Sequence, residues 1–235
     1  MLDTKFWEKY FKTYDLLNSI KPYQSLLDMV YSLLNLEDGD KVLEAGCGTG
    51  NFCTKLKRLN PKLVVVGLDN NIEALRIYRM KDSDASVVHA NMGYLLPFDD
   101  SYFDKISCLH ALYWLSHSER NIAVKELIRV LKTGGLIVFV NPSENFSSFK
   151  ISIDAVLDNL HDVGVLSTFK FLVKYSLSSI KIILYTKRLL GGKSNKFLSV
   201  DNEYLGSLLS QCGCTVLKVK RVYSNQSNLI LAIKK

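Results

Sequence analysis

The chain has 235 residues, 48% of them hydrophobic, so it is long enough to bury a core and fits one α/β domain better than two. Its five cysteines are an odd number without CxxC spacing, which suggests neither a disulfide framework nor a metal site and favours a reducing cytosol. The first residues hold acidic side chains and no uninterrupted apolar run, unlike a signal peptide or a membrane span, so a cytoplasmic protein is expected. The net charge of +7 equals the charge of residues 163–200, which carry seven Lys and Arg and no Asp or Glu. The basicity therefore belongs to one segment and gives the whole chain no nucleic-acid character.

Helical spacing of apolar residues predicts a helix over 3–20 and a second one that opens at Pro22. From Asp40 onward, short β-branched or apolar runs alternate with helical stretches. Strands are expected at 41–44, 63–68, 86–89, 105–109 and 136–140, with helices at 50–59, 72–80 and 118–131 between them. The glycines in 132–135 suit the end of the last of these helices. The alternation predicts a doubly wound parallel sheet.

The last part of the chain predicts a helix near 200–211 and two strands, 215–223 and 228–233, which are close enough to pair as an antiparallel hairpin. The expected fold is α/β, a doubly wound Rossmann-like seven-stranded sheet with a C-terminal antiparallel hairpin edge and a helical lid insertion. We expect one domain over 1–235, in four parts: N-terminal helices 1–38, a ligand-binding core 40–142, the insertion 143–199, and the last helix and hairpin 200–235.

The first expected strand runs directly into Gly46-x-Gly48-x-Gly50. Glycines at the carboxyl end of a strand let a ligand approach the backbone, and the following helix presents unpaired N–H groups. A glycine-rich turn can also be only a tight turn, but Asp69, about 20 residues further on, is positioned to accept hydrogen bonds from two ribose hydroxyls. The dinucleotide pattern G-x-G-x-x-G requires glycine at 51, where the chain has Asn51. The sequence therefore predicts a nucleotide site of another kind than that for NAD or FAD.

The segment Glu44–Gly50 matches the E/D-x-G-x-G-x-G motif of the class I S-adenosylmethionine (AdoMet)-dependent methyltransferases, which the chain resembles from about Asp40 to its C-terminus. Two further motifs of that family, at 103–106 and 126–137, stand in the same order and spacing. The antiparallel hairpin edge is also typical of this fold. Within the class, the chain resembles the small-molecule branch that contains ubiquinone and menaquinone biosynthesis enzymes. The resemblance implies a methyltransferase that uses AdoMet as its cofactor and releases S-adenosylhomocysteine.

The resemblance also implies which residues bind the cofactor. Glu44 and the glycine loop would hold its methionine part, Asp69 its ribose, and Asn70 with Asn71 would flank its adenine. Asn91 stands where the family usually has an acidic residue, and its amide oxygen can accept a hydrogen bond from the adenine amine. The full predicted set is Tyr14, Glu44, Gly46, Cys47, Gly48, Gly50, Asp69, Asn70, Asn71, Asn91, Met92 and Leu109.

Tyr14 is expected to close over the site from the N-terminal helix, although its helical spacing with Trp7 and Tyr10 also fits a simple core position. His110 follows the fourth expected strand, where this family turns from cofactor to acceptor. It could be a general base for a hydroxyl acceptor, or it could line the pocket through packing or a backbone hydrogen bond.

On a helical wheel of residues 169–190, four basic side chains form one stripe beside broad apolar surfaces: Lys170, Lys174, Lys181 and Arg188. Such a helix suits an anionic membrane surface, or it is a lid helix with a solvated face. Together with the resemblance, this basic amphipathic helix favours a small hydrophobic or lipid-like acceptor and possible peripheral membrane contact. Two alternatives stay open. One is an RNA methyltransferase that grips phosphates with 163–200, which the lack of an Asn-Pro-Pro-aromatic motif after the fourth strand disfavours. The other is a non-catalytic AdoMet-binding protein.

Overall fold

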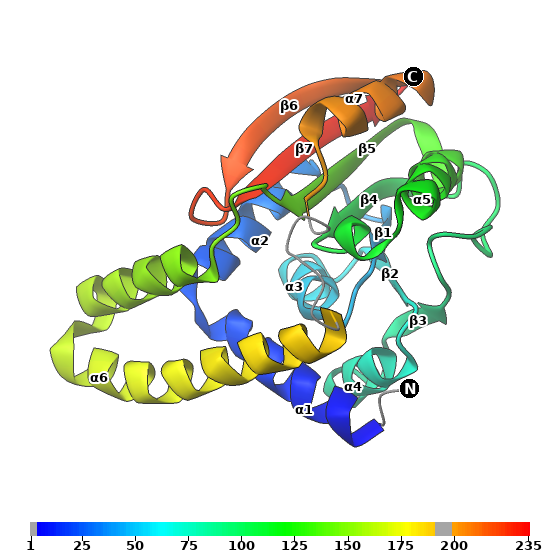
Figure 1. The fold of residues 1–235 in the computed structure, drawn as a ribbon. Coiled ribbons are helices and arrows are strands. Elements are labelled where there is room, and N and C mark those ends of the chain that lie inside the picture. Colours follow the sequence, from blue (N-terminus) through cyan, green and yellow to red (C-terminus); the bar gives the residue numbers. More distant parts are fainter. Residues whose placement is uncertain (1–3, 191–198) are drawn as a thin grey trace.

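The computed structural model describes residues 4–190 and 199–235, and it leaves many side chains within 4–17 and 169–190 undescribed. One seven-stranded sheet, in the order β3-β2-β1-β4-β5-β7-β6, forms the centre of the fold (Figure 1). The strands are β1 (Lys41–Ala45), β2 (Val64–Asp69), β3 (Ser86–His89), β4 (Phe103–Leu109), β5 (Leu131–Pro142), β6 (Cys214–Val222) and β7 (Ser227–Lys234). The helices are α1 (Thr4–Tyr14), α2 (Lys21–Leu33), α3 (Asn51–Leu59), α4 (Ile72–Lys81), α5 (His117–Val130), α6 (Ser148–Leu190) and α7 (Asn202–Gln211), with short 3-10 helices η1 (Asp15–Ser19) and η2 (Leu112–Trp114).

Strands β1 to β5 pair in parallel, whereas β7 pairs antiparallel with both β5 and β6. This confirms the predicted doubly wound sheet with an antiparallel hairpin edge. Because β1 lies between β2 and β4, the order of the strands reverses there, and ligands of such sheets bind at the carboxyl ends of the strands flanking the reversal.

Helices cover both faces of the sheet. One apolar cluster packs α5 and α7 against it through residues such as Leu127 and Leu208. The other packs α2, α3 and α4 against the opposite face through residues such as Leu27, Leu56 and Tyr78. The helix starts follow local chemistry: Pro22 lies in the first turn of α2, and a reciprocal pair between Ser116 and Glu119 caps α5. The one-domain organisation stays a prediction.

The structure corrects the N-terminal helix, which was expected to run over 3–20. The α-helix ends at Tyr14, and the chain continues as the 3-10 helix η1 to Ser19. The carboxylate of Asp15, at this transition, accepts a hydrogen bond from Thr49 and forms an ion pair with Lys81. These tertiary contacts hold the start of η1, and the periodicity of apolar residues does not reveal them.

The glycines in 132–135 do not end helix α5, so that prediction is wrong. Leu131 already has extended geometry and pairs with Phe103, and the next paired residue of β5 is Leu136. The four residues between them bulge out of the sheet, with Gly134 at φ +79°. Leu131 is fully buried, which explains why strand pairing begins there instead of after the glycines.

The insertion 143–199 is helical over most of its length, as expected. Helix α6 is broken at Gly164 (φ +79°, ψ 178°) into two arms that form a bend at the edge of the molecule (Figure 1). The first arm packs Ile151 and Ala155 against the cluster around α2, and α6 also contacts α1. Among the described residues, no helix is long and apolar enough to cross a membrane.

Candidate functional site

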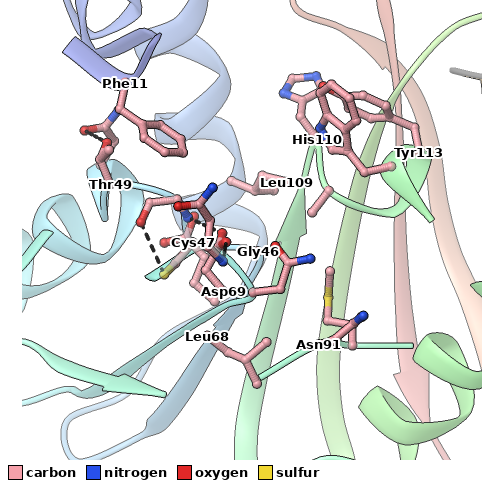
Figure 2. Close-up of a pocket in the computed structure, with 18 of the residues that line it drawn as sticks. Phe11, Gly46, Cys47, Thr49, Leu68, Asp69, Asn91, Leu109, His110 and Tyr113 are labelled. Atoms are coloured by element: carbon pink, nitrogen blue, oxygen red, sulfur yellow. Dashed lines mark hydrogen bonds between the residues drawn. The ribbon is translucent and has the colours of Figure 1, made fainter. Parts of the chain in front are cut away.

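A cavity of about 550 Å³ lies at the carboxyl ends of β1, β2 and β4, where the strand order reverses. The loops after these strands form its floor. Phe11 and Thr49 lie on one side of it, and His110 and Tyr113 lie on the other (Figure 2). The cavity is therefore where the sequence predicted a nucleotide site.

The glycine loop after β1 is fastened to β2 by its backbone. The N–H groups of Gly46 and Cys47 both donate to the carbonyl oxygen of Leu68, at 2.7 and 2.9 Å. Gly46 has φ +78°, and a Cβ atom there would lie 2.3 Å from the Cβ of Ala111. Only glycine fits this position, because a side chain would collide with the loop after β4.

Asp69 joins two loops. Its Oδ2 accepts from the N–H of Gly48 and its Oδ1 from that of Asn71, both at 2.8 Å. Burial raises the pKa of Asp69, while these backbone hydrogen bonds act in the opposite direction. Each oxygen keeps a second lone pair, which agrees with the predicted contact to two ribose hydroxyls. The side chain of Asn71 caps α4 by accepting from the N–H groups of Glu73 and Ala74.

Glu44 lines the cavity from below the loop and is 4% exposed. Its Oε2 accepts from the backbone N–H and the thiol of Cys53, at 3.0 and 2.8 Å. Burial, followed by the neighbouring Cys53, raises the pKa of Glu44 well above its usual range. No described residue forms an ion pair with it. A buried carboxylate of this kind gains from a ligand that brings its own cation, such as an amino group.

One predicted cofactor residue does not line the cavity, and the side chain of another lies outside the described residues. Gly50 does not line the cavity: it begins α3 at φ +74°, and a Cβ atom there would lie 2.2 Å from the ring of Tyr78. Its glycine is explained by packing. Tyr14 ends α1, and its side chain lies outside the described residues.

The other predicted residues line the cavity. They are Glu44, Gly46, Cys47, Gly48, Asp69, Asn70, Asn71, Asn91, Met92, Leu109 and His110. The Oδ1 atom of Asn91 accepts from the N–H of Gly93 at 2.9 Å. The amide oxygen assigned to the adenine amine is therefore already engaged in its own loop, and only its second lone pair or the NH₂ group is left for a ligand. The cofactor roles of all these residues stay predictions.

The sequence analysis missed an aromatic wall, which we define as Trp7, Tyr10, Phe11, Tyr23, Tyr113 and Trp114. Three of these residues, Trp7, Tyr10 and Phe11, lie on α1, from which only Tyr14 was expected to close over the site. Tyr10 and Phe11 are indeed largely buried, and they also face the cavity. The spacing of apolar residues predicts that one face of a helix is buried, but it does not tell whether that face packs against the core or lines a cavity.

A polar cluster holds α1 and η1 next to the glycine loop. The hydroxyl of Thr49 donates to Asp15 at 2.5 Å, and Asp15 forms an ion pair of 2.7 Å with Lys81. Lys81 also donates to the carbonyl oxygen of Thr49 and to the side chain of Asn51, at 3.2 and 3.0 Å. Asn51, which excluded the dinucleotide pattern, thus takes part in joining α1, the loop and α4.

His110 lies at the turn after β4 with φ +51°, and its backbone N–H donates to Val140 at 2.7 Å. Its Nε2 is 2.9 Å from the hydroxyl of Ser227, and its ring is tilted against Tyr223. Burial lowers the pKa of His110 to about 4, so the ring is uncharged at neutral pH. These contacts support the alternative in which His110 lines the pocket, with a side-chain bond to Ser227 in addition to the expected backbone bond. Its role as a base stays a prediction.

The charged residues of the 126–137 motif serve the fold. Arg129 forms an ion pair with Glu126 at 2.8 Å and donates to the carbonyl oxygens of Leu96 and Phe98, while Glu126 accepts from the N–H of Leu96. The ion pair between Arg129 and Glu126 thereby fixes residues 96–98, which follow the loop that contains Asn91.

Comparisons with known proteins agree with this geometry. Residues 43–139 match the family described as "Methyltransferase domain". A demethylmenaquinone methyltransferase of Bacillus subtilis is 30% identical over 152 residues, which cover 59% of this chain and 62% of that protein. An uncharacterised protein of Methanocaldococcus jannaschii is 38% identical over 136 residues, which cover 57% of this chain and 49% of that protein. The chain thus spans about half to three fifths of the length of these relatives.

Solved structures show the same fold over the whole chain. A SAM-dependent methyltransferase from Aquifex aeolicus superimposes with a TM-score of 0.65 at 15% identity and covers 100% of both chains. The N-methyltransferase NodS from Bradyrhizobium japonicum, solved in complex with S-adenosyl-L-homocysteine, has a TM-score of 0.61 at 15% identity and covers 93% of this chain and 90% of its own.

Proposed function

We propose that the chain is a class I, AdoMet-dependent methyltransferase that transfers a methyl group from AdoMet to a small, uncharged, apolar acceptor; the match of residues 43–139 to the methyltransferase domain family supports this. The observation that carries the proposal is the meeting of two unlike surfaces in one cavity. The glycine loop with Glu44 and Asp69 lines one part of it, and the aromatic wall lines another part from two directions, with Phe11 beside Thr49 and Tyr113 across the cavity (Figure 2).

The polar side suits the cofactor. Asp69 offers two carboxylate oxygens beside the loop, where ribose hydroxyls would donate. Glu44 offers a buried carboxyl group, and the amino group of the methionine part would stabilise its charged form. The backbone at Gly48 leaves room for that part, since no heavy atom beyond its chain neighbours lies within 4 Å of a Cβ placed there.

The apolar side suits the acceptor. Aromatic side chains supply large apolar area and flat faces, and none of the described residues that line the cavity is Lys or Arg. A carboxylate or phosphate on the acceptor would lose its water here without gaining a cation, which disfavours charged metabolites and nucleic-acid phosphates. The relative from Bacillus subtilis, named for demethylmenaquinone, supports an acceptor of this apolar kind.

The reaction needs little from the protein besides alignment. The acceptor's nucleophile attacks the methyl carbon in line with the carbon–sulfur bond, that bond breaks, and S-adenosylhomocysteine leaves with the electron pair on sulfur. The residues of the loop orient the donor, and the aromatic wall excludes water from the path. If the nucleophile carries a proton, neutral His110 in the cavity wall is the candidate to accept it, with a basicity that burial lowers.

Calorimetric titration tests the first half of the proposal. We expect both AdoMet and S-adenosylhomocysteine to bind, and the absence of heat for both at high micromolar ligand would overturn it. The second half is tested by the release of S-adenosylhomocysteine with hydroquinones and other apolar acceptors, compared with their carboxylated analogues and with RNA. We expect turnover only with the uncharged acceptors. Binding without turnover on any of them would favour the non-catalytic alternative.

We further propose, from the sequence, that residues 169–190 contact a membrane surface through the stripe of Lys170, Lys174, Lys181 and Arg188. The side chains of this stripe lie outside the described residues. The backbone here is helical, as the proposal requires.

A further inference from the structure

The first arm of α6 has its apolar and acidic faces reversed relative to an ordinary surface helix. At 100° per residue, Phe149, Ile153, Leu157 and Leu160 fall within about 80° of one another. Their exposed fractions lie between 42% and 71%. We call these four residues the apolar stripe. Surface helices of soluble proteins normally turn such a stripe toward the core.

The acidic residues of the same arm lie on the side that faces the protein. Asp162 forms an ion pair of 2.9 Å with Lys21 of α2. Asp154 and Asp158, together with Leu157 at the border of the apolar stripe, line a groove whose opposite wall is formed by α2 and the β6–β7 turn. This side also carries the two buried residues of the arm, Ile151 and Ala155. The outward face thus has apolar side chains where water-facing helices have charges.

The bend between the arms continues this surface. Gly164 breaks the helix, and its neighbours Val163, Val165 and Leu166 are 55%, 76% and 73% exposed. We call these three residues the tip. The tip has a defined geometry, because the hydroxyl of the buried Thr168 lies 2.7 Å from the carbonyl oxygen of Gly164 and 3.2 Å from Oδ1 of Asn159 on the first arm. Figure 1 shows this bend projecting away from the sheet.

Charge indicates what covers this surface. The second arm of α6, from the tip to Leu190, carries five Lys and Arg and no Asp or Glu, so the arm behind the tip is strongly basic. A second copy docked face to face would bring two such segments together, and like charges would repel. An anionic lipid surface satisfies both features, since it attracts the basic arm and takes up the apolar side chains below its headgroups.

We therefore propose that the tip and the apolar stripe of α6 are a docking surface that inserts into the interface of an anionic lipid bilayer. This docking surface consists of residues outside the cavity. It differs from the basic stripe of 169–190, because it is formed by side chains that the structure describes. Helix α6 also contacts α1, which bears part of the aromatic wall.

Vesicle flotation of the full chain tests this surface. Vesicles of phosphatidylcholine alone are compared with vesicles that also contain phosphatidylglycerol. We expect the protein to float with the anionic vesicles, and binding should weaken in high salt. In the double variant Val165→Asp/Leu166→Asp, we expect binding to fall about tenfold or more, because two apolar side chains leave the interface and two negative charges enter it.

Met80→Asp is the matched control, because Met80 is 73% exposed on α4, a helix outside this surface. It should float like the unchanged protein. Circular dichroism and S-adenosylhomocysteine titration show that each variant is folded. The proposal is overturned if the unchanged protein stays with the unbound fraction, or if the double variant floats equally well. It is also overturned if sedimentation shows a dimer that the double variant dissociates while neither protein binds vesicles. Flotation without cofactor binding would instead contradict the proposed function and leave the docking surface standing.

Discussion

The two sides of the cavity are assembled in different ways. The cofactor side consists of short segments in which backbone groups and one or two carboxylates bind residues of the adjacent strand, as Gly48 and Asp69 do. The acceptor side consists of bulky side chains brought together from α1, α2 and η2, far apart in the sequence. A local motif can encode the first arrangement, but the second exists only after the chain has folded. Changes on the cofactor side should therefore have sharp effects that depend on single atoms.

The largest effect is expected at two glycines of the same loop. In Gly50→Ala the new Cβ atom would lie 2.2 Å from the fully buried ring of Tyr78, at φ +74°. We expect the free energy of unfolding to fall by about 3–5 kcal/mol, because both the overlap and the left-handed backbone are unfavourable. Gly48 has φ +53° but open space around it, so Gly48→Ala should cost only about 1–2 kcal/mol.

Urea unfolding of the two variants measures this difference. Equal losses of stability would mean that Tyr78 gives way, and the tight packing behind the loop would then not require glycine at 50. The pair also separates folding from binding, because Gly48 lines the cavity and Gly50 does not.

The second effect concerns ligand affinity. In Asp69→Asn the side chain loses its charge and one of its two acceptor oxygens, so it can no longer accept from Gly48, Asn71 and two ribose hydroxyls together. We expect S-adenosylhomocysteine to bind about 10–100-fold more weakly by calorimetry, as for the loss of a hydrogen bond to a charged group. Asp99→Asn, on an exposed loop residue, is the control and should bind normally. If Asp69→Asn bound S-adenosylhomocysteine with unchanged affinity, the role of Asp69 would be only to hold the two loops together.

The sequence predicted well which residues of the polar side line the cavity, because this pattern is local. The strand and its three glycines are consecutive, and the carboxylate of Asp69 ends the next strand along the chain. Because these two strands pair in parallel, the sheet brings Glu44, Gly46 and Asp69 together. The sequence could not show that Gly50 faces Tyr78, since that contact depends on how α3 packs on α4. It also could not show that the amide oxygen of Asn91 accepts from the N–H of Gly93, because this hydrogen bond depends on the conformation of the loop.

The acceptor side was predicted only in outline. The expected insertion is helical, but half of the aromatic wall comes from α1, of which only Tyr14 was expected at the site. The 3-10 helix η1 and the bulge before Leu136 depend on tertiary contacts of Asp15 and Leu131, which leave no periodic pattern. The pattern of apolar residues predicts which face of a helix or strand is buried. Which residues pack against that face depends on the tertiary fold.

His110 lies at the border of the two sides, and its effect should depend on pH. The folded protein holds the pKa of His110 at about 4, whereas an unfolded chain takes up this proton near pH 6.5. The unfolded state therefore binds more protons below pH 6.5, and stability falls as the pH falls. We expect a loss of about 1–2 kcal/mol between pH 6.5 and about pH 5 that is absent in His110→Gln.

Unfolding free energies of the two proteins across this range give the comparison. If His110→Gln shows the same slope, the imidazole is more hydrated than its contacts with Ser227 and Tyr223 indicate. Once an acceptor is known, the same variant tests the base: a loss of about 100-fold in turnover at neutral pH would support it, and an unchanged rate would leave His110 as part of the wall.

The smallest effect is expected at Glu44, where stability and binding should change in opposite directions. Because burial raises the pKa of this carboxyl, the folded state binds its proton more tightly than the unfolded chain, and stability is lost as the pH rises toward the folded pKa. Glu44→Gln removes the titrating group while its amide oxygen can still accept from the N–H of Cys53. We expect a gain of about 1 kcal/mol at neutral pH and none near pH 4, together with weaker S-adenosylhomocysteine binding, because the ligand's amino group loses its counter-charge. Glu144→Gln, on an exposed residue, should change neither quantity. If Glu44→Gln gained stability but bound the ligand normally, Glu44 would be a cap of α3 alone, and the charge that the cofactor side offers its ligand would have to come from Asp69.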